Sequence, residues 1–114
     1  MSRLSFRIEF GPGRRLGPGK VELLEQIHAT GSISAAGRAL GMSYRRAWLL
    51  VSELNHIFRR PLVVTLAGGR QGGGATLSPE GRDVIKRYRR MEREAGRAMA
   101  TDLRALRRLA TRSR

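Results

Sequence analysis

The residues of this sequence with the clearest capacity for chemistry are Ser43, Tyr44, Arg45, Arg46 and Trp48, which lie within one short stretch. An arginine guanidinium can donate two parallel hydrogen bonds to O6 and N7 of guanine, and hydroxyl and guanidinium groups bind phosphates. Aromatic side chains can pack against a thymine methyl. The stretch therefore indicates recognition of double-stranded DNA. The alternatives are a solvated charged face for the arginines, and core or interface packing for Tyr44 and Trp48.

A second stretch, residues 66–78, places five glycines around Arg70 and Gln71. Ordering glycines costs much conformational entropy, but a backbone without side chains can approach a ligand closely. A phosphate cradle requires a helix start directly after the glycines, and none is expected there. We predict a hairpin tip whose backbone approaches sugars and phosphates while Arg70 and Gln71 reach a minor groove. A slack loop without a partner is the alternative.

The composition favours the same partner. The chain has 114 residues, the size of one ordinary domain, and a formal net charge of +14 carried mainly by arginine. Arginine suits phosphates and guanine edges, so nucleic acid is the leading partner. A basic composition inherited from a high-GC genome is the alternative.

Catalytic and metal chemistry find little support in the sequence. It has no cysteine, and His28 and His56 are isolated, so we expect no metal site and no thiolate nucleophile. The segment ending in Gly19-Lys20 superficially suggests a phosphate-binding loop, but that motif would need other residues at Arg14 and Val21. We therefore expect neither an enzyme nor a cofactor.

Targeting and membrane segments are also not expected. The first residues lack a continuous apolar run, and no stretch approaches the roughly 18 apolar residues of a spanning helix. We expect a soluble cytoplasmic protein that associates with the nucleoid and not with a membrane.

Residue spacing predicts the elements that position these groups. Apolar residues alternate over 4–10, which is typical of a half-buried strand, and a turn-rich connector follows. Helical spacing, serine caps and glycine stops predict helices over about 18–30 and 32–40 and from Ser43 to before Pro61. β-Branched residues on both sides of the glycines predict a hairpin over 62–77.

A long helix over 79–110 is predicted to follow, with Ser78 as its cap. At 1.5 Å per residue it would be about 48 Å long, too long to bury itself on so small a domain. We expect a second copy of the chain to cover its apolar stripe and form a homodimer. The predicted dimerisation residues are Val84, Tyr88, Met91, Ala95, Met99, Leu103 and Leu106.

The predicted fold class is mainly α with a small β component. Residues 1–78 form a winged helix-turn-helix, with the helix-turn-helix over about 32–58 and the wing over about 62–77. Residues 79–114 form the dimerisation helix with a basic tail. The helix that starts at Ser43 is the one expected to enter a major groove.

The run GSISAAGRALGMSYRRAWLLVSELN, followed by LVVTLAGGRQGGGATLSPEGRDVIKRY, resembles the N-terminal DNA-binding domain of the molybdate-responsive ModE regulators, which are akin to LysR-type winged helices. The resemblance implies a dimeric transcriptional regulator whose third helix and wing contact DNA. Ser32 and Ser34, in the GSIS motif, join the predicted DNA-binding residues.

The ModE pattern continues into oxyanion-binding domains, whereas this sequence ends at Arg114. We therefore expect a stand-alone form with no molybdate site within this chain. Such a chain would bind DNA constitutively, sense something at the dimer helices, or be an excised domain. The competing functional class is a nucleoid architectural protein that coats DNA without reading its sequence.

Overall fold

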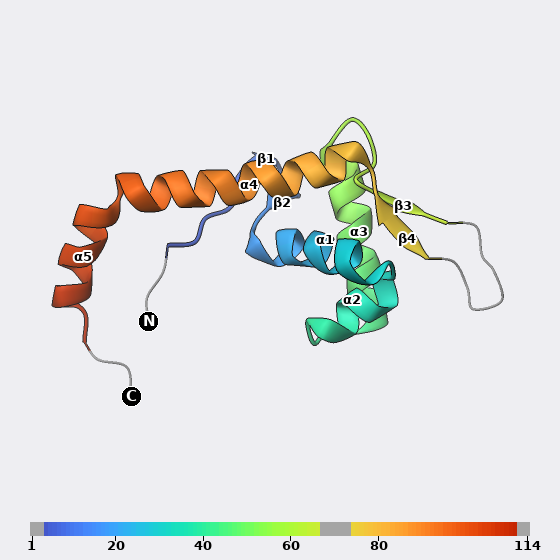
Figure 1. Ribbon diagram of the computed structural model, residues 1–114, viewed down its shortest axis with the longest axis horizontal. Helices are drawn as coiled ribbons and strands as arrows, with labels where there is room; N and C mark the ends of the chain where they lie inside the picture. The colour runs from blue at the N-terminus through green and yellow to red at the C-terminus, as the bar shows by residue number, and fades with distance from the viewer. Residues whose placement is uncertain (1–3, 67–73, 112–114) are drawn as a thin grey trace.

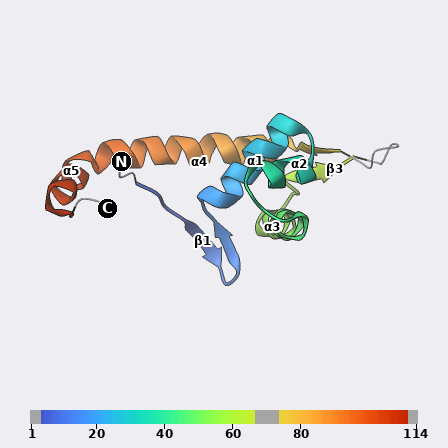
Figure 2. The ribbon, with the colours of Figure 1, turned by 90° about the horizontal axis from the view of Figure 1, so that it is seen from below.

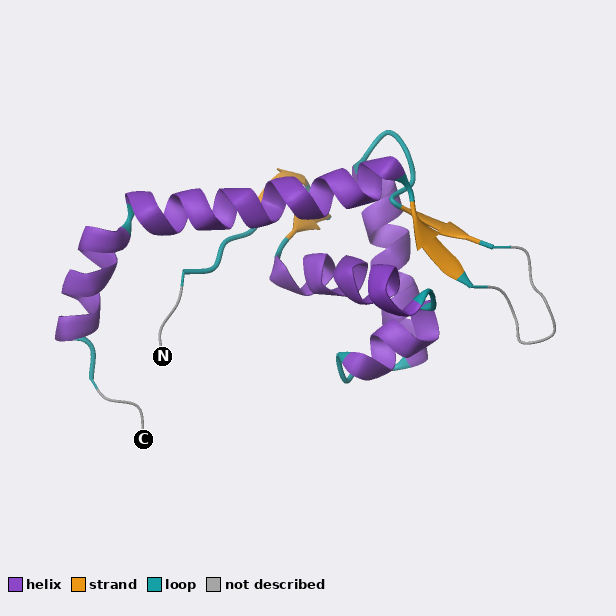
Figure 3. Ribbon diagram, in the orientation of Figure 1, coloured by secondary structure: helices purple, strands orange, loops and turns teal. Residues whose placement is uncertain are grey.

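The computed structural model describes residues 4–66 and 74–111. Within them lie five helices and two small antiparallel sheets, so the predicted mainly α fold with a small β part is confirmed (Figures 1 and 3). The helices are α1 Pro18–Thr30, α2 Ile33–Ala39, α3 Tyr44–Ile57, α4 Pro79–Ala98 and α5 Ala100–Leu109. The strands are β1 Ile8–Gly11, β2 Arg14–Leu16, β3 Val63–Thr65 and β4 Ala75–Leu77.

The core lies between α1, α2 and α3, and α4 closes it from one side (Figure 1). The predicted serine caps are confirmed, because the hydroxyl oxygens of Ser32, Ser43 and Ser78 each accept a hydrogen bond of 3.1 Å from a first-turn amide. The fully buried side chains are mainly aliphatic: Val21, Leu23, Leu24, Ile27, Leu54 and Leu62. Apolar burial by three short helices is thus the main source of stability.

A close crossing of α2 and α3 forms the helix-turn-helix. A Cβ added to Gly37 would lie 2.9 Å from the Cβ of Ala47, so the two helix backbones approach more closely than larger residues would allow. Gly41 supports the turn with a φ of 71°, a left-handed conformation that favours glycine. These small residues fix the angle at which α3 is presented.

The N-terminal region differs from the prediction. The strand predicted over 4–10 is shorter and later, and the segment predicted as a connector contains β2, which pairs with β1 in the register Ile8 to Leu16. A strand of three residues with two arginines has no apolar alternation, so its sequence carries no strand signal. Phe6 does not join the strand and stacks on Tyr88 of α4.

The predicted single helix over 79–110 is also wrong. It divides at Met99 into α4 and α5, and α5 turns away from the line of α4 (Figure 1). Kinks usually follow proline or glycine, but the nearest glycine is Gly96 and no proline stands at the break. The sequence therefore offers no signal that places the bend.

The backbone around Leu62 joins three elements, and we call Pro61, Leu62 and Val63 the Leu62 junction. The Leu62 amide donates to the Oδ1 atom of Asn55 on α3 at 2.9 Å. The Leu62 carbonyl accepts a hydrogen bond of 2.9 Å from the amide of Ser78, and the Ser78 hydroxyl donates to the Pro61 carbonyl at 2.7 Å. Helix α3, the β3–β4 hairpin and the start of α4 therefore meet at one backbone segment.

Gly81, in the first turn of α4, tests this junction. A Cβ at Gly81 would overlap the carbonyl oxygen of Leu62, whereas a Cβ at Gly96 on the same helix would meet nothing within 4 Å. We expect Gly81→Ala to lower the free energy of unfolding by about 1–3 kcal/mol through overpacking. Gly96→Ala should raise it by about 0.5–1 kcal/mol, because alanine loses less entropy in a helix. Denaturant unfolding at one protein concentration measures both, and a neutral Gly81→Ala would contradict the close contact.

Candidate nucleic-acid interface

The first two turns of α3 present a polar and aromatic face to solvent. Because a helix has about 3.6 residues per turn, the side opposite the buried Ala47, Leu50 and Leu54 is exposed. Tyr44 is 62% exposed and Trp48 38%, so the alternative that packed them in the core is wrong. The structure thus brings together the predicted residues Ser43, Tyr44, Arg45, Arg46 and Trp48.

The chemistry of this face fits a phosphate-bearing ligand. Arg45 and Arg46 are exposed and form no ion pair within residues 4–66 and 74–111, so both guanidinium groups are open to a partner. The Tyr44 and Trp48 rings meet edge to face with centroids 6.1 Å apart. Ser43 contributes as a cap, because its Oγ atom accepts a hydrogen bond from the amide of Arg46 and orders the first turn.

The two serines of the GSIS motif lie at the start of α2, Ser32 as its N-cap and Ser34 in its first turn. The Ser32 hydroxyl is engaged as the cap of α2 at the amide of Ala35, and Ser34 is partly buried in the first helical turn. The N-terminus of α2 therefore offers mainly its backbone and a partly covered hydroxyl to a ligand.

The predicted wing is present as the antiparallel pair β3 and β4, with Val63 opposite Leu77 and Thr65 opposite Ala75. It projects from the end of the molecule opposite α5 (Figures 1 and 2). Arg70 and Gln71 fall outside the described residues. The β3–β4 hairpin is held on the same body as α3, as a wing that flanks a reading helix would be.

Asn55 is a positioning residue that the sequence analysis missed. Its Oδ1 atom accepts hydrogen bonds from the amides of Leu62 and Val63 at 2.9 and 3.1 Å. Its Nδ2 atom donates a hydrogen bond to the Val63 carbonyl at 3.1 Å. One amide side chain thus links the last turns of α3 to the first residue of β3. An amide at the edge of the inward face of α3 was the available signal.

The structure also adds Leu49 and Ser52 to the exposed face of α3. Leu49 is 52% exposed although it is a large apolar residue, and it lies one turn after Arg45. The sequence analysis passed over both residues because it considered only the first turn and Trp48.

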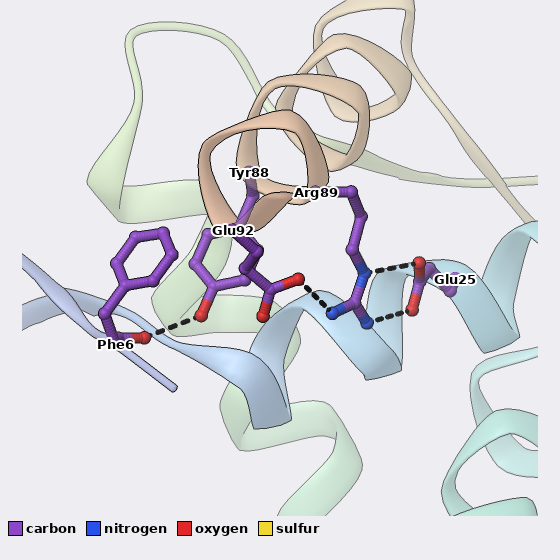
Figure 4. A network of polar contacts seen from close by, with 5 residues as sticks. All are labelled: Phe6, Glu25, Tyr88, Arg89 and Glu92. Carbon is purple, nitrogen blue, oxygen red and sulfur yellow. Dashed lines mark hydrogen bonds and ion pairs between the residues drawn. The ribbon is translucent and has the colours of Figure 1, made fainter. Parts of the chain in front are cut away.

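Helix α4 is attached to α1 and to the N-terminal segment by a polar network (Figure 4). Arg89 donates through Nε and Nη2 to the Glu25 carboxylate of α1 at 3.0 and 2.6 Å, and through Nη1 to Glu92 at 2.7 Å. The Tyr88 hydroxyl donates to the carbonyl of Phe6 at 2.6 Å, and the two rings stack with centroids 4.8 Å apart. The network fixes the direction in which α4 leaves the core.

This placement corrects the role predicted for Tyr88. Its side chain is 1% exposed within the chain's own core, so its ring is already covered and is not available to a partner. Val84 is partly buried against the same core. Among the other predicted dimerisation residues, Ala95 and Leu103 are partly buried, and Met91, Met99 and Leu106 are exposed.

Two groups of this network, Tyr88 and Arg89, have raised pKa values. Burial raises the pKa of the Tyr88 phenol above its ordinary value, with Glu92 adding to the effect. The hydrogen bonds from Arg89 to Glu25 raise the pKa of the guanidinium still further above its usual range. At neutral pH Tyr88 is therefore a neutral donor and Arg89 a fixed cation.

The described residues contain no helix that is both long and apolar enough to cross a membrane. In the same part of the chain, no three histidine, cysteine or acidic side chains gather as a metal site would require.

A helix-turn-helix with an exposed basic and aromatic third helix, followed by a β-hairpin, defines a winged helix DNA-binding domain. Residues 19–82 match the bacterial regulatory helix-turn-helix proteins of the lysR family, and the chain belongs to this family. The members of this family are described as bacterial regulatory proteins.

Individual relatives extend this assignment. The chain is 45% identical over 80 residues to the molybdenum-pterin-binding protein MopB of Rhodobacter capsulatus, covering 70% of this chain and 30% of that protein. It is 38% identical over 94 residues to the molybdenum transport protein ModE of Azotobacter vinelandii, covering 82% and 34%. It is also 38% identical over 71 residues to the DNA-binding transcriptional dual regulator ModE of Escherichia coli K12, covering 62% and 27%. The resemblance to the ModE N-terminal DNA-binding domain is therefore confirmed, and the match spans about a third of the length of these relatives.

The buried phenol of Tyr88 predicts a component of stability that depends on pH. Its folded-state pKa is raised above the ordinary value of 10.0, so this component is complete below about pH 10 and is lost as the pH rises through the folded value. We expect Tyr88→Phe to lower the free energy of unfolding by about 0.5–1.5 kcal/mol at neutral pH. The variant should also lack the loss of stability that ionisation of Tyr88 causes at alkaline pH. Tyr44, the other tyrosine, is exposed, so Tyr44→Phe should behave as the wild type. Melting temperatures between pH 7 and pH 11 test this, and parallel curves for Tyr88→Phe and the wild type would contradict it.

Proposed function

We propose that this chain is a sequence-specific double-stranded DNA-binding regulator of transcription. In this proposal α3 enters the major groove, and the wing contacts the backbone or a minor groove. The observation that carries it is the exposed group of Tyr44, Arg45, Arg46 and Trp48 on the third helix of a lysR-family helix-turn-helix. Of these, Arg45 lies most directly opposite the buried face of α3, which makes it the residue best placed to reach base edges.

A nucleoid protein that coats DNA is the alternative function, and the net charge of +14 favours it as much as it favours a regulator. Coating needs positive charge alone. Exposing the aromatic pair Tyr44 and Trp48 to water is unfavourable, and a purely electrostatic contact has no use for these rings. The exposed aromatic pair therefore supports a regulator that recognises a DNA sequence over a protein that coats DNA.

A homodimer is the second part of the proposal. Met91 of α4, Met99 at the break and Leu106 of α5 are 43%, 48% and 62% exposed, and Leu109 at the end of α5 is 80% exposed. An apolar surface of this kind on one long arm of the molecule favours burial against a second copy. A two-fold dimer would present two copies of α3 to an inverted repeat.

The remaining parts of the proposal follow from DNA binding. A protein that binds the bacterial chromosome acts in the cytoplasm, at the nucleoid. We assign no molybdate site to these residues: the partly buried guanidinium of Arg89 is already bound by Glu25 and Glu92 and is not open to an oxyanion. We infer that this region's own contribution is DNA recognition.

Arg45→Ala tests sequence-specific reading. Loss of a guanidinium fork to guanine should cost about 1–3 kcal/mol in binding to an operator selected from random DNA, and much less in binding to a scrambled sequence. Arg70→Ala, in the proposed wing tip, should weaken binding to both DNAs evenly and lower the salt slope by about one counterion. Binding curves on both DNAs at several salt concentrations measure this. Equal weakening of both DNAs by Arg45→Ala would support coating instead.

Leu106→Glu tests the dimer. A carboxylate on the exposed stripe of α5 should shift the chain from dimer to monomer and weaken binding to an inverted repeat whose half-site centres lie about 34 Å, or a multiple of that, apart. Leu66→Glu, on an exposed leucine after β3, is the matched control and should leave the mass unchanged. Light scattering at micromolar concentration gives the mass, and a monomeric wild type would refute the proposal.

A further inference from the structure

The exposed face of α3 carries an apolar residue that the proposed DNA contact does not yet explain. Leu49 is 52% exposed and lies on the same side of the helix as Arg45 and Ser52, opposite the buried Ala47 and Leu50. A single exposed leucine is ordinary on a protein surface. Here it adjoins Trp48 in sequence and follows Arg45 by one turn, at the centre of a face whose other exposed residues are aromatic, polar or cationic.

The neighbours of Leu49 limit what can cover it. Arg45 and Arg46 are exposed and form no ion pair among the described residues, so an occupant of this face must tolerate or match two positive charges. An apolar protein segment would leave those charges without partners. The major groove of B-DNA offers both acceptors and phosphates for the arginines and, on thymine, an exposed methyl group for an apolar side chain.

We propose that Leu49 is a specificity-determining residue that packs against the C5-methyl group of a thymine in each half-site. This inference rests on the proposed function and deepens it, because it states which chemical group of the operator the middle of α3 recognises. The contact selects thymine over cytosine by shape and dehydration, with no hydrogen bond.

The helix geometry also places the thymine relative to the base read by Arg45. Four residues advance by about 6 Å along an α-helix, which corresponds to about two base steps of B-DNA. The thymine contacted by Leu49 therefore lies within about two base pairs of the guanine whose recognition is lost in Arg45→Ala.

Deoxyuridine scanning isolates this methyl group. Binding sites are first selected from random DNA with the full chain, and each thymine of the selected site is then replaced by deoxyuridine, which lacks only the methyl. The wild type should lose about fourfold in affinity at one or two positions in each half-site, the effect expected for one buried methyl group. Leu49→Ala should bind the thymine site more weakly by a similar factor and show no further loss with deoxyuridine at those positions.

Two controls separate this contact from a folding defect. Leu49→Met keeps an apolar side chain of similar size and should retain the dependence on the methyl group. Leu49→Ala should melt at the wild-type temperature, because the side chain is half exposed and outside the core.

The outcomes distinguish this inference from the proposal on which it rests. If deoxyuridine has no effect at any position, or if Leu49→Ala keeps the full deoxyuridine effect, the thymine contact is refuted while sequence-specific binding stands. If selection enriches no sequence and Arg45→Ala weakens all DNA equally, the regulator itself is refuted and the inference falls with it.

Discussion

The Leu62 junction is the constraint on which the arrangement of this protein depends. The Leu62 amide donates a hydrogen bond to Asn55 on α3, and the Leu62 carbonyl accepts one from the amide of Ser78, before α4. Gly81 lies against the same carbonyl oxygen. Leu62 itself is fully buried. Helix α3, the β3–β4 hairpin and the long arm of α4 and α5 thus share one reference point. A shift of any one of them would break hydrogen bonds of partly buried groups, which is costly.

Small residues and one polar network complete that framework. Gly37 and Ala47 let α2 cross α3 closely, which sets how the exposed face of α3 is presented. Arg89 and Tyr88 hold α4 to α1 and to the N-terminal segment at Phe6. The direction of α4 therefore depends on the same body that carries α3. In a dimer formed through α4 and α5, the spacing between the two copies of α3 would follow from these contacts and not from a flexible linker.

The charge of the molecule is distributed in keeping with this design. Carboxylates of α1, α3 and α4 pair with Lys20, Arg87 and Arg89, away from the first turns of α3. Arg45 and Arg46 are left exposed beside apolar and aromatic groups. Electrostatic attraction alone would bring the chain to any nucleic acid, whereas the mixture of cationic and apolar groups on α3 is suited to distinguishing base edges.

The sequence by itself determined the helices α1 to α3, the wing and the exposed group on α3, because capping serines, glycine stops and apolar spacing are local signals that fix each element. It did not determine β2, the break at Met99, the burial of Tyr88 or the role of Asn55. Three of these depend on a contact with another element or segment: Leu16 pairs with Ile8, Tyr88 contacts Phe6, and Asn55 binds the Leu62 junction. The break at Met99 has no signal in the residues around it. Only the tertiary structure decided them, since a side chain's role as core, clamp or surface is set by what the fold brings against it, and residue spacing does not encode that.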